Sequence, residues 1–233
     1  MDFLKLAQSL KMSKQKTLIY VIRHGESAFN VSLDIKTRLI DGKLESPLTD
    51  IGKTQAKKLA KKLTDVELVA IYASDLSRTK ETAEIIALEK NLKPVYHNTI
   101  RERSVHDYHK LNEKYEFDEL MNIILKHLST LDETGKMKYK HTPLMESAEE
   151  GAIRLLSFIK EAVFTHQGKA IAIVCHGNIM RSLLTHLGFA KYDELPHGSI
   201  ENTGYFVLES DGIDFFVKEA FGVNKRVGEF RNF

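Results

Sequence analysis

Thr17-Leu-Ile-Tyr-Val-Ile-Arg-His-Gly-Glu-Ser27 is the stretch that decides the fold. Its first half is a short apolar run rich in β-branched residues, which predicts a buried strand. The run ends at Arg23-His24-Gly25, so a cation and an imidazole follow the carboxyl end of that strand. Ligands bind beyond such strand ends in open α/β sheets. We therefore predict that His24 is a nucleophile and that Arg23 binds a phosphate beside it.

Strand and helix patterns alternate along the rest of the chain. Further strands are predicted over residues 66–73, 94–96 and 169–175, and a hairpin is predicted over 204–209 and 213–220. Helices are predicted over 27–36, 52–64, 74–90, 113–131, 147–166 and 176–187. The alternation predicts an α/β three-layer sandwich, in which a mostly parallel central sheet has helices on both faces and an antiparallel edge.

The domain organisation is expected to be simple. The 233 residues carry no repeat and no Gly/Pro/Ser linker, so we predict a single domain over residues 1–233. Residues 1–16 are predicted to be an N-terminal arm, and about 103–145 a lid insertion beside the site. Within the lid, residues 132–143 are polar and typical of turns. The segment after residue 222 is interpreted as a terminal arm.

Composition narrows the partners. The net charge is +2, so bulk charge favours neither nucleic acid nor a membrane as a partner. Cys175 is the single cysteine, which excludes an internal disulfide and a thiolate metal cluster and fits a reducing compartment. No apolar run approaches the ~20 residues of a membrane helix, and no signal-peptide pattern is seen at the N-terminus. We expect a cytoplasmic protein, monomeric or homodimeric.

Several charged or titratable residues recur where predicted strands end. His176-Gly177 follows the strand 169–175 as His24-Gly25 follows the first strand, while Arg78 and Glu102 follow two others. A phosphoryl group carries about two negative charges, and the planar fork of arginine matches its oxygens. Arginines also favour the neutral, nucleophilic form of a nearby imidazole. Glu102 is the candidate acid for the leaving oxygen, although it could instead pair with a neighbouring arginine.

In order, these motifs resemble those of the histidine phosphatase superfamily, the phosphoglycerate-mutase-like group marked by Arg-His-Gly-Glu. The similar segments are Arg23 to Asn30, Pro47 to Gly52 with Gln55-Ala56, Tyr72 to Ala83, Ile100 to Glu102, Glu146-Ser147 with Arg154, His176-Gly177-Asn178 with Arg181, and Asn202. The resemblance implies the phosphoglycerate mutase-like fold and a metal-independent phosphatase of the histidine acid type, without a cofactor.

The resemblance also implies roles for individual residues. His24 would take the phosphoryl group, and Arg23, Arg78 and His176 would bind it. Glu102 would protonate the leaving group and then activate water. Further substrate contacts would come from a second set: Asn30, Gly177 and Asn178. The substrate would be a small phosphorylated molecule or a phosphoprotein.

Alternatives remain open at this point. The segment after Glu102 departs from the family pattern, since the chain has no tryptophan. Residues 107–143 contain no arginine, which argues against a phosphoglycerate mutase. A non-catalytic protein that binds phosphorylated ligands would need only Arg23 and Arg78. Cys175 and Arg181 are spaced as in cysteine-dependent phosphatases, yet Cys175 continues an apolar strand pattern. His106 and His109 suggest a lid surface more than a metal site.

Overall fold

The computed structural model describes residues 16–31, 39–40, 43–44, 46–103, 117–143 and 145–226. Within them, a central sheet has the strand order β5-β4-β6-β1-β7-β8. These strands are β1 (Thr17–Arg23), β4 (Leu68–Ala73), β5 (Val95–Tyr96), β6 (Ala170–Cys175), β7 (Ile200–Ser210) and β8 (Phe215–Val223). The strands β5, β4, β6 and β1 run parallel, and β7 and β8 form the antiparallel edge. The predicted sheet is confirmed.

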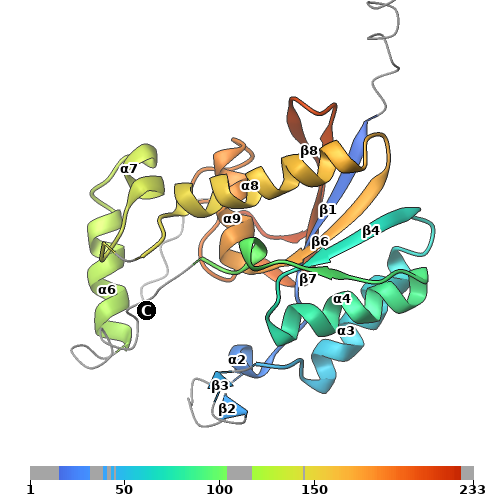
Figure 1. Ribbon diagram of the computed structural model, residues 1–233. Helices are drawn as coiled ribbons and strands as arrows, with labels where there is room; N and C mark the ends of the chain where they lie inside the picture. Colours follow the sequence, from blue (N-terminus) through green and yellow to red (C-terminus); the bar gives the residue numbers. More distant parts are fainter. Residues whose placement is uncertain are drawn as a thin grey trace, which may run out of the picture.

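Helices cover both faces of this sheet, as Figure 1 shows. The helices α8 (Ala148–Thr165) and α9 (Gly177–His186) pack on one face, and α3 (Asp50–Lys62) and α4 (Ser77–Lys90) pack on the other. Alternate residues of β1 serve the two layers: Ile19 and Val21 face α8 and α9, while Ile22 faces α3 and α4. Because both faces are covered, the parallel strands read as continuous apolar runs.

The helix ends follow local chemistry. Ser147 and Glu150 form the capping box expected at the start of α8, and Thr49 caps α3 through the Gly52 N–H. Gly168, which follows α8, has φ 72°, a left-handed conformation that glycine adopts without steric cost. These devices confirm the helices predicted near residues 52–64 and 147–166.

Smaller elements lie outside the three layers. They are α2 (Ala28–Val31), β2 (Leu39–Ile40), β3 (Lys43–Leu44), the 3₁₀ turn η2 (Asn98–Ile100), α6 (Phe117–Leu128) and α7 (Glu133–Lys138). Residues 132–143 were predicted as turns, and this prediction is wrong for α7. The Asp132 carboxylate accepts the Gly135 N–H and caps that short helix.

Other boundaries also differ from the prediction. The hairpin is longer than expected, because Ile200 and Val223 also pair. The predicted arm after residue 222 begins inside β8, and Asn224 then donates its backbone N–H to Ser199. Residues 1–15, 32–38, 41–42, 45, 104–116, 144 and 227–233 lie outside the described residues, so the N-terminal arm, part of the lid and the second half of the helix predicted over 27–36 stay predictions. Among the described residues, no helix is both long and apolar enough to cross a membrane.

Candidate active site

The structure brings His24 and His176 together at neighbouring strand ends. β1 and β6 pair in register up to Arg23 and Cys175, so the two histidines follow at the same level of the sheet. Their ring centroids are 5.3 Å apart, and both side chains are buried. Parallel pairing therefore delivers two residues that are 152 positions apart in the sequence to one point.

Arg78 connects the two rings. Its Nε donates to Nε2 of His24 at 3.1 Å, and its Nη2 lies 3.0 Å from Nδ1 of His176. Arg78 lies in the first turn of α4, which follows β4, so a third strand end contributes to the same place. Since a guanidinium can only donate hydrogen bonds, Nδ1 of His176 is the acceptor, and the proton of this neutral ring is on Nε2.

His24 has the opposite tautomer. Its Nδ1 lies 2.7 Å from the carbonyl oxygen of Gly25, which can only accept, so Nδ1 carries the proton. The lone pair is then on Nε2. Burial, together with the charges of Arg78 and Arg23, holds the pKa of His24 well below its ordinary value, against the opposing effect of the Gly25 hydrogen bond. Burial and Arg78 lower the pKa of His176 in the same way. His24 is thus a neutral imidazole whose Nε2 lone pair accepts the hydrogen bond from Arg78.

Two buried N–H groups at the site make no hydrogen bond within the described part of the chain. They are Nε of Arg23 and Nε2 of His176. Arg23 uses Nη1 to donate to the Ile200 carbonyl. Buried donors normally have partners, and those that lack one in the protein are suited to receiving an acceptor from a ligand. A phosphoryl oxygen would satisfy this requirement.

Residues of α4 and β7 hold the backbone of the short loop after β1 that carries His24. The Gly25 N–H donates to Oγ1 of Thr82, and the carbonyl of His24 accepts from Thr203 N and from Nδ2 of Asn202. Thr203 has φ 58°, a conformation that is uncommon for a β-branched residue. This strained residue on β7 was not predicted, and no local sequence signal marks it.

The start of α3 presses closely against the same loop. A Cβ on Gly52 would lie 2.0 Å from the Glu26 carbonyl oxygen, and one on Gly25 would lie 2.6 Å from the Gly52 carbonyl oxygen. Only glycine permits this approach. Thr49 and Gln55 then bind Glu26, through its carboxylate and its N–H respectively. The motif at residues 47–56 therefore holds the loop that carries His24.

Glu102 reaches the site but contacts backbone N–H groups. Its carboxylate accepts from Asn178 N at 2.9 Å and Ile179 N at 2.8 Å, both at the start of α9, and from Arg103 N at 2.9 Å. The alternative of an ion pair with Arg101 is not observed, since Arg101 pairs with Asp75. The helix N-terminus is a favourable place for a carboxylate.

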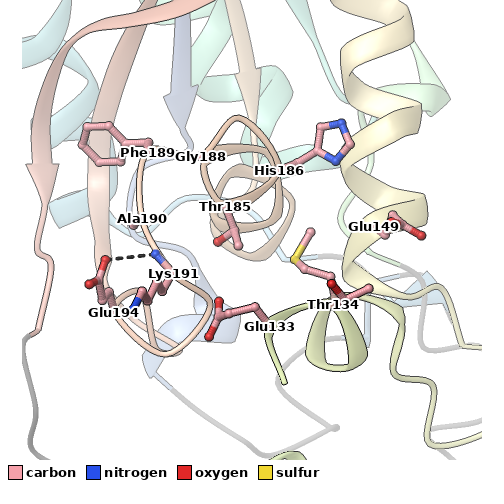
Figure 2. Close-up of a pocket in the computed structure, with 11 residues that line it drawn as sticks. Glu133, Thr134, Glu149, Thr185, His186, Gly188, Phe189, Ala190, Lys191 and Glu194 are labelled. Atoms are coloured by element: carbon pink, nitrogen blue, oxygen red, sulfur yellow. Dashed lines mark hydrogen bonds between the residues drawn. The ribbon is translucent and has the colours of Figure 1, made fainter. Parts of the chain in front are cut away.

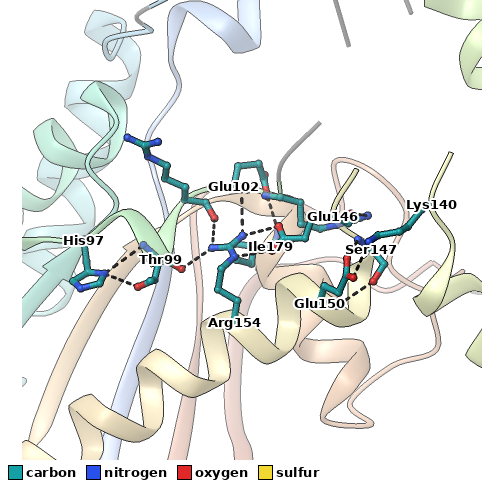
Figure 3. A network of polar contacts seen from close by, with 11 residues as sticks. His97, Thr99, Glu102, Lys140, Glu146, Ser147, Glu150, Arg154 and Ile179 are labelled. Atoms are coloured by element: carbon teal, nitrogen blue, oxygen red, sulfur yellow. Dashed lines mark hydrogen bonds and ion pairs between the residues drawn. The ribbon is translucent and has the colours of Figure 1, made fainter. Parts of the chain in front are cut away.

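Figure 3 shows how the segment carrying Glu102 is held. Arg154 forms a two-pronged ion pair with Glu146, with both N–O distances 2.7 Å. Its Nη1 donates to the carbonyls of Thr99 and Arg101. Glu146 and Arg154 belong to the segments that resemble the superfamily, but the sequence predicted no role for either residue. The structure shows that the pair ties α8 to the segment before Glu102.

The other predicted contacts are near the site but engaged within the protein. Oδ1 of Asn30 accepts from Ser27 N at 3.0 Å and from Nδ2 of Asn202 at 3.3 Å. Oδ1 of Asn178 accepts from Nη1 of Arg181 at 2.9 Å. Gly177 follows His176 against the Arg23 side chain, because its Cβ would lie 3.2 Å from Nε of Arg23. Substrate contacts by Asn30, Gly177 and Asn178 stay predictions.

Cys175 does not have the environment of a reactive thiol. It is fully buried in β6, and burial raises the pKa of its thiol. A reactive cysteine needs the thiolate form and access to its substrate. The structure therefore does not support the cysteine alternative.

A pocket of about 480 Å³ lies elsewhere, between α7, α9 and the loop after α9 (Figure 2). Its lining includes Glu133, Glu149, His186 and Lys191, and none of the residues that surround His24. The pocket is thus separate from the cluster of histidines and arginines.

Comparisons with known proteins show the family to which the chain belongs. The sequence model described as "Histidine phosphatase superfamily (branch 1)" matches residues 19–221. The chain belongs to this superfamily. The match to the family model therefore covers nearly all of the described residues.

Some relatives are named as phosphatases and others as phosphoglycerate mutases. The chain is 29% identical over 185 residues to a probable phosphoglycerate mutase, GpmB, of Photorhabdus laumondii, covering 76% of this chain and 77% of the relative. It is 28% identical over 184 residues to a metal-independent phosphoserine phosphatase of Arabidopsis thaliana, covering 77% and 72%. The solved structure of Bacillus stearothermophilus YhfR has a TM-score of 0.66 and 30% identity, with 87% of this chain and 95% of that chain covered.

Proposed function

We propose that the protein is a phosphatase that hydrolyses a phosphomonoester through a phosphohistidine on Nε2 of His24. The single observation that carries this proposal is the 2.7 Å contact between Nδ1 of His24 and the carbonyl oxygen of Gly25, from which the tautomer follows. Because the Gly25 carbonyl fixes the proton on Nδ1, the lone pair on Nε2 is the one directed toward Arg78. A nucleophile that is neutral and oriented next to a phosphate-binding arginine suits phosphoryl transfer.

The first step transfers the phosphoryl group to the enzyme. The Nε2 lone pair of His24 forms the N–P bond while the ester P–O bond breaks, and the leaving oxygen accepts a proton. In the second step, water attacks phosphorus, the N–P bond breaks and its electron pair returns to Nε2. The water proton passes to a general base, and inorganic phosphate leaves.

Charge stabilisation comes from donors already present in the site. Arg78 donates to His24 through Nε, and Nε of Arg23 and Nε2 of His176 carry N–H groups that make no hydrogen bond within the described residues. The N–H groups of Arg23 and His176 can stabilise the negative charge on the phosphoryl oxygens without reorganising, whereas Arg78 must first leave His24; removing one such donor typically costs about 10²–10³ in rate. This supports Arg23, Arg78 and His176 as phosphate ligands.

Glu102 is proposed as the proton donor of the first step and the proton acceptor of the second. Its support is the position of its carboxylate, which accepts the N–H groups of Asn178 and Ile179 in the first turn of α9, directly after His176-Gly177. Oε1 of Glu102 already accepts two hydrogen bonds, but Oε2 accepts only one, so Oε2 can take part in a further hydrogen bond. A Glu102→Gln variant should form the phosphoenzyme slowly with a poor leaving group and less slowly with a good one.

The test is phosphate release from an aryl phosphate and from a panel that includes L-phosphoserine, 3-phosphoglycerate and a phosphopeptide. His24→Ala should lower turnover by about 10³-fold or more, as expected when a nucleophile is removed. His186→Ala is the matched control, since His186 is exposed and lies on the far pocket. Trapped radiolabelled phosphoenzyme should be acid-labile and absent from His24→Ala.

Two other functions have distinct outcomes in the same assay. The mutase names among the relatives favour a phosphoglycerate mutase as the second candidate. The mutase would be supported if 3-phosphoglycerate were converted to 2-phosphoglycerate faster than it released phosphate. If no ester in the panel releases phosphate in a His24-dependent manner, the result would favour a protein that binds phosphorylated ligands without turning them over.

A further inference from the structure

β8 is the edge strand at the antiparallel side of the sheet, seen in red in Figure 1. It pairs with β7 on one side, and no pairing with another strand is found on its outer side among the described residues. An open edge strand presents a row of N–H and C=O groups that can pair with another strand. The sequence of β8 indicates which strand that is.

The register between β7 and β8 places two aromatic side chains of β8 on the same face. Val207 pairs with Glu219 and the adjacent Leu208 pairs with Val217, so Lys218 is an extra, bulged residue. A bulge resets the alternation of side chains along the strand. Phe221 and Glu219 therefore share the face of Tyr205 and Val207, and Phe216 lies on that face as well. Phe216 is 65% exposed and Phe221 is 52% exposed.

The strand is complementary to itself when it is read in the antiparallel direction. Placing a two-fold axis between Lys218 and Glu219 sets Lys218 opposite Glu219 of a second copy. The same register sets Phe216 opposite Phe221 and Val217 opposite Ala220. Each pair joins side chains of like character from matching faces. Opposite charges and aromatic pairs that face each other across two strands stabilise antiparallel pairing.

We propose that the protein forms a two-fold dimer in which β8 pairs antiparallel with β8 of a second copy, through this register. A two-fold interface uses one patch twice, so the patch must complement itself. Moving the register by one residue sets Lys218 against Lys218 or Glu219 against Glu219, which is unfavourable. Charge complementarity therefore selects a second copy of this chain and one alignment.

Neighbouring groups are compatible with this contact. Lys218 also lies 3.5 Å from Glu209, and its side chain remains 52% exposed, so it can reach a second carboxylate. Nζ of Lys62 lies 3.1 Å from the centre of the Phe221 ring. The contact consists of one strand and its flanking side chains, which places it at the small end of specific interfaces. The dimer should consequently form and dissociate with concentration.

Sedimentation velocity of the full chain, from about 1 µM to about 1 mM, tests the proposal. The wild type should shift from monomer to dimer over this range. Lys218→Glu and Glu219→Lys should each remain monomeric, because each variant sets like charges opposite one another. A mixture of the two variants should dimerise, since every cross-strand charge pair is then opposite in sign. The double variant that exchanges both charges should dimerise alone.

Two results would overturn the proposal. One is a wild type that stays monomeric throughout; if the outward-facing β8 amides are then protected from hydrogen exchange at every concentration, another part of the same chain covers the edge. The other is a dimer that both single variants retain. Thermal unfolding of each variant checks that Lys218→Glu, which also loses the contact with Glu209, still folds.

Discussion

Replacing Arg154 by alanine should both destabilise the protein and slow its chemistry. Arg154 makes two charge-assisted bonds to Glu146 and donates to two carbonyls of the segment before Glu102 (Figure 3). Removing one partner of a fully buried ion pair costs about 3–5 kcal/mol. The side chains of Arg154 and Glu146 are 25% and 16% exposed, so water compensates part of the loss. We expect about 3 kcal/mol, or roughly 150-fold in the folding equilibrium.

Guanidinium unfolding at pH 7 measures this stability, and an aryl phosphate measures turnover. Because the Glu102 segment loses its anchor, turnover should fall by about 10- to 100-fold, the effect expected when a reacting group is misplaced by about 1 Å. Lys160→Ala, an exposed change on the same helix, should stay within about 0.5 kcal/mol of wild type. The double variant Glu146→Gln/Arg154→Met should lose less than the sum of its single changes. An Arg154→Ala protein as stable and as active as wild type would refute this account of the ion pair.

Three further predictions follow from the site. Gly52→Ala should lower the free energy of unfolding by more than about 2 kcal/mol and lower turnover, since its Cβ would lie 2.0 Å from the Glu26 carbonyl oxygen. Gly135→Ala is the control and should be nearly neutral, because its Cβ would lie no closer than 3.1 Å to another atom. Equal stability of the two variants in urea unfolding would contradict the close approach of Gly52 to Glu26. Because the pKa values of His24 and His176 are lowered, both imidazoles should remain neutral as pH falls through about 6.5. Nitrogen NMR should show protons on Nδ1 of His24 and on Nε2 of His176. An imidazolium signal from either ring at pH 6 would contradict the lowering of the pKa by burial and by the arginines. Cys175→Ala should keep most of the turnover in the phosphatase assay, and complete loss in a folded variant would exclude His24 as the nucleophile.

The sequence predicted the architecture well because strand and helix signals in this chain are local. The runs at 17–23 and 169–175 are apolar on both faces, which only a covered strand explains, and Thr49 and Ser147 mark helix starts through their own side chains. The convergence of His24, Arg78 and His176 was predictable for a related reason. Parallel strands bring their carboxyl ends to one edge, so residues that follow those ends meet there.

Features that depend on contacts between distant segments were not predictable. The left-handed Thr203 is set by its bond to the His24 carbonyl, and nothing in its neighbouring residues requires that conformation. The engagement of Glu102 by the start of α9 depends on how that helix packs against the segment at 99–103. The helix α7 was missed because its cap, Asp132, lies in a polar stretch whose composition is equally typical of turns.

The hydrogen bond between Arg78 and His24 has a consequence for how a reaction at this site would begin. Nε2 of His24 holds a single lone pair, and in this structure that lone pair accepts the Nε–H of Arg78. The same electrons cannot attack phosphorus until the bond is released. A phosphate that draws Arg78 onto its own oxygens would therefore uncover the nucleophile by the act of binding. Between turnovers the hydrogen bond from Arg78 would shield the imidazole of His24 from other electrophiles, and binding of the phosphate would break this bond.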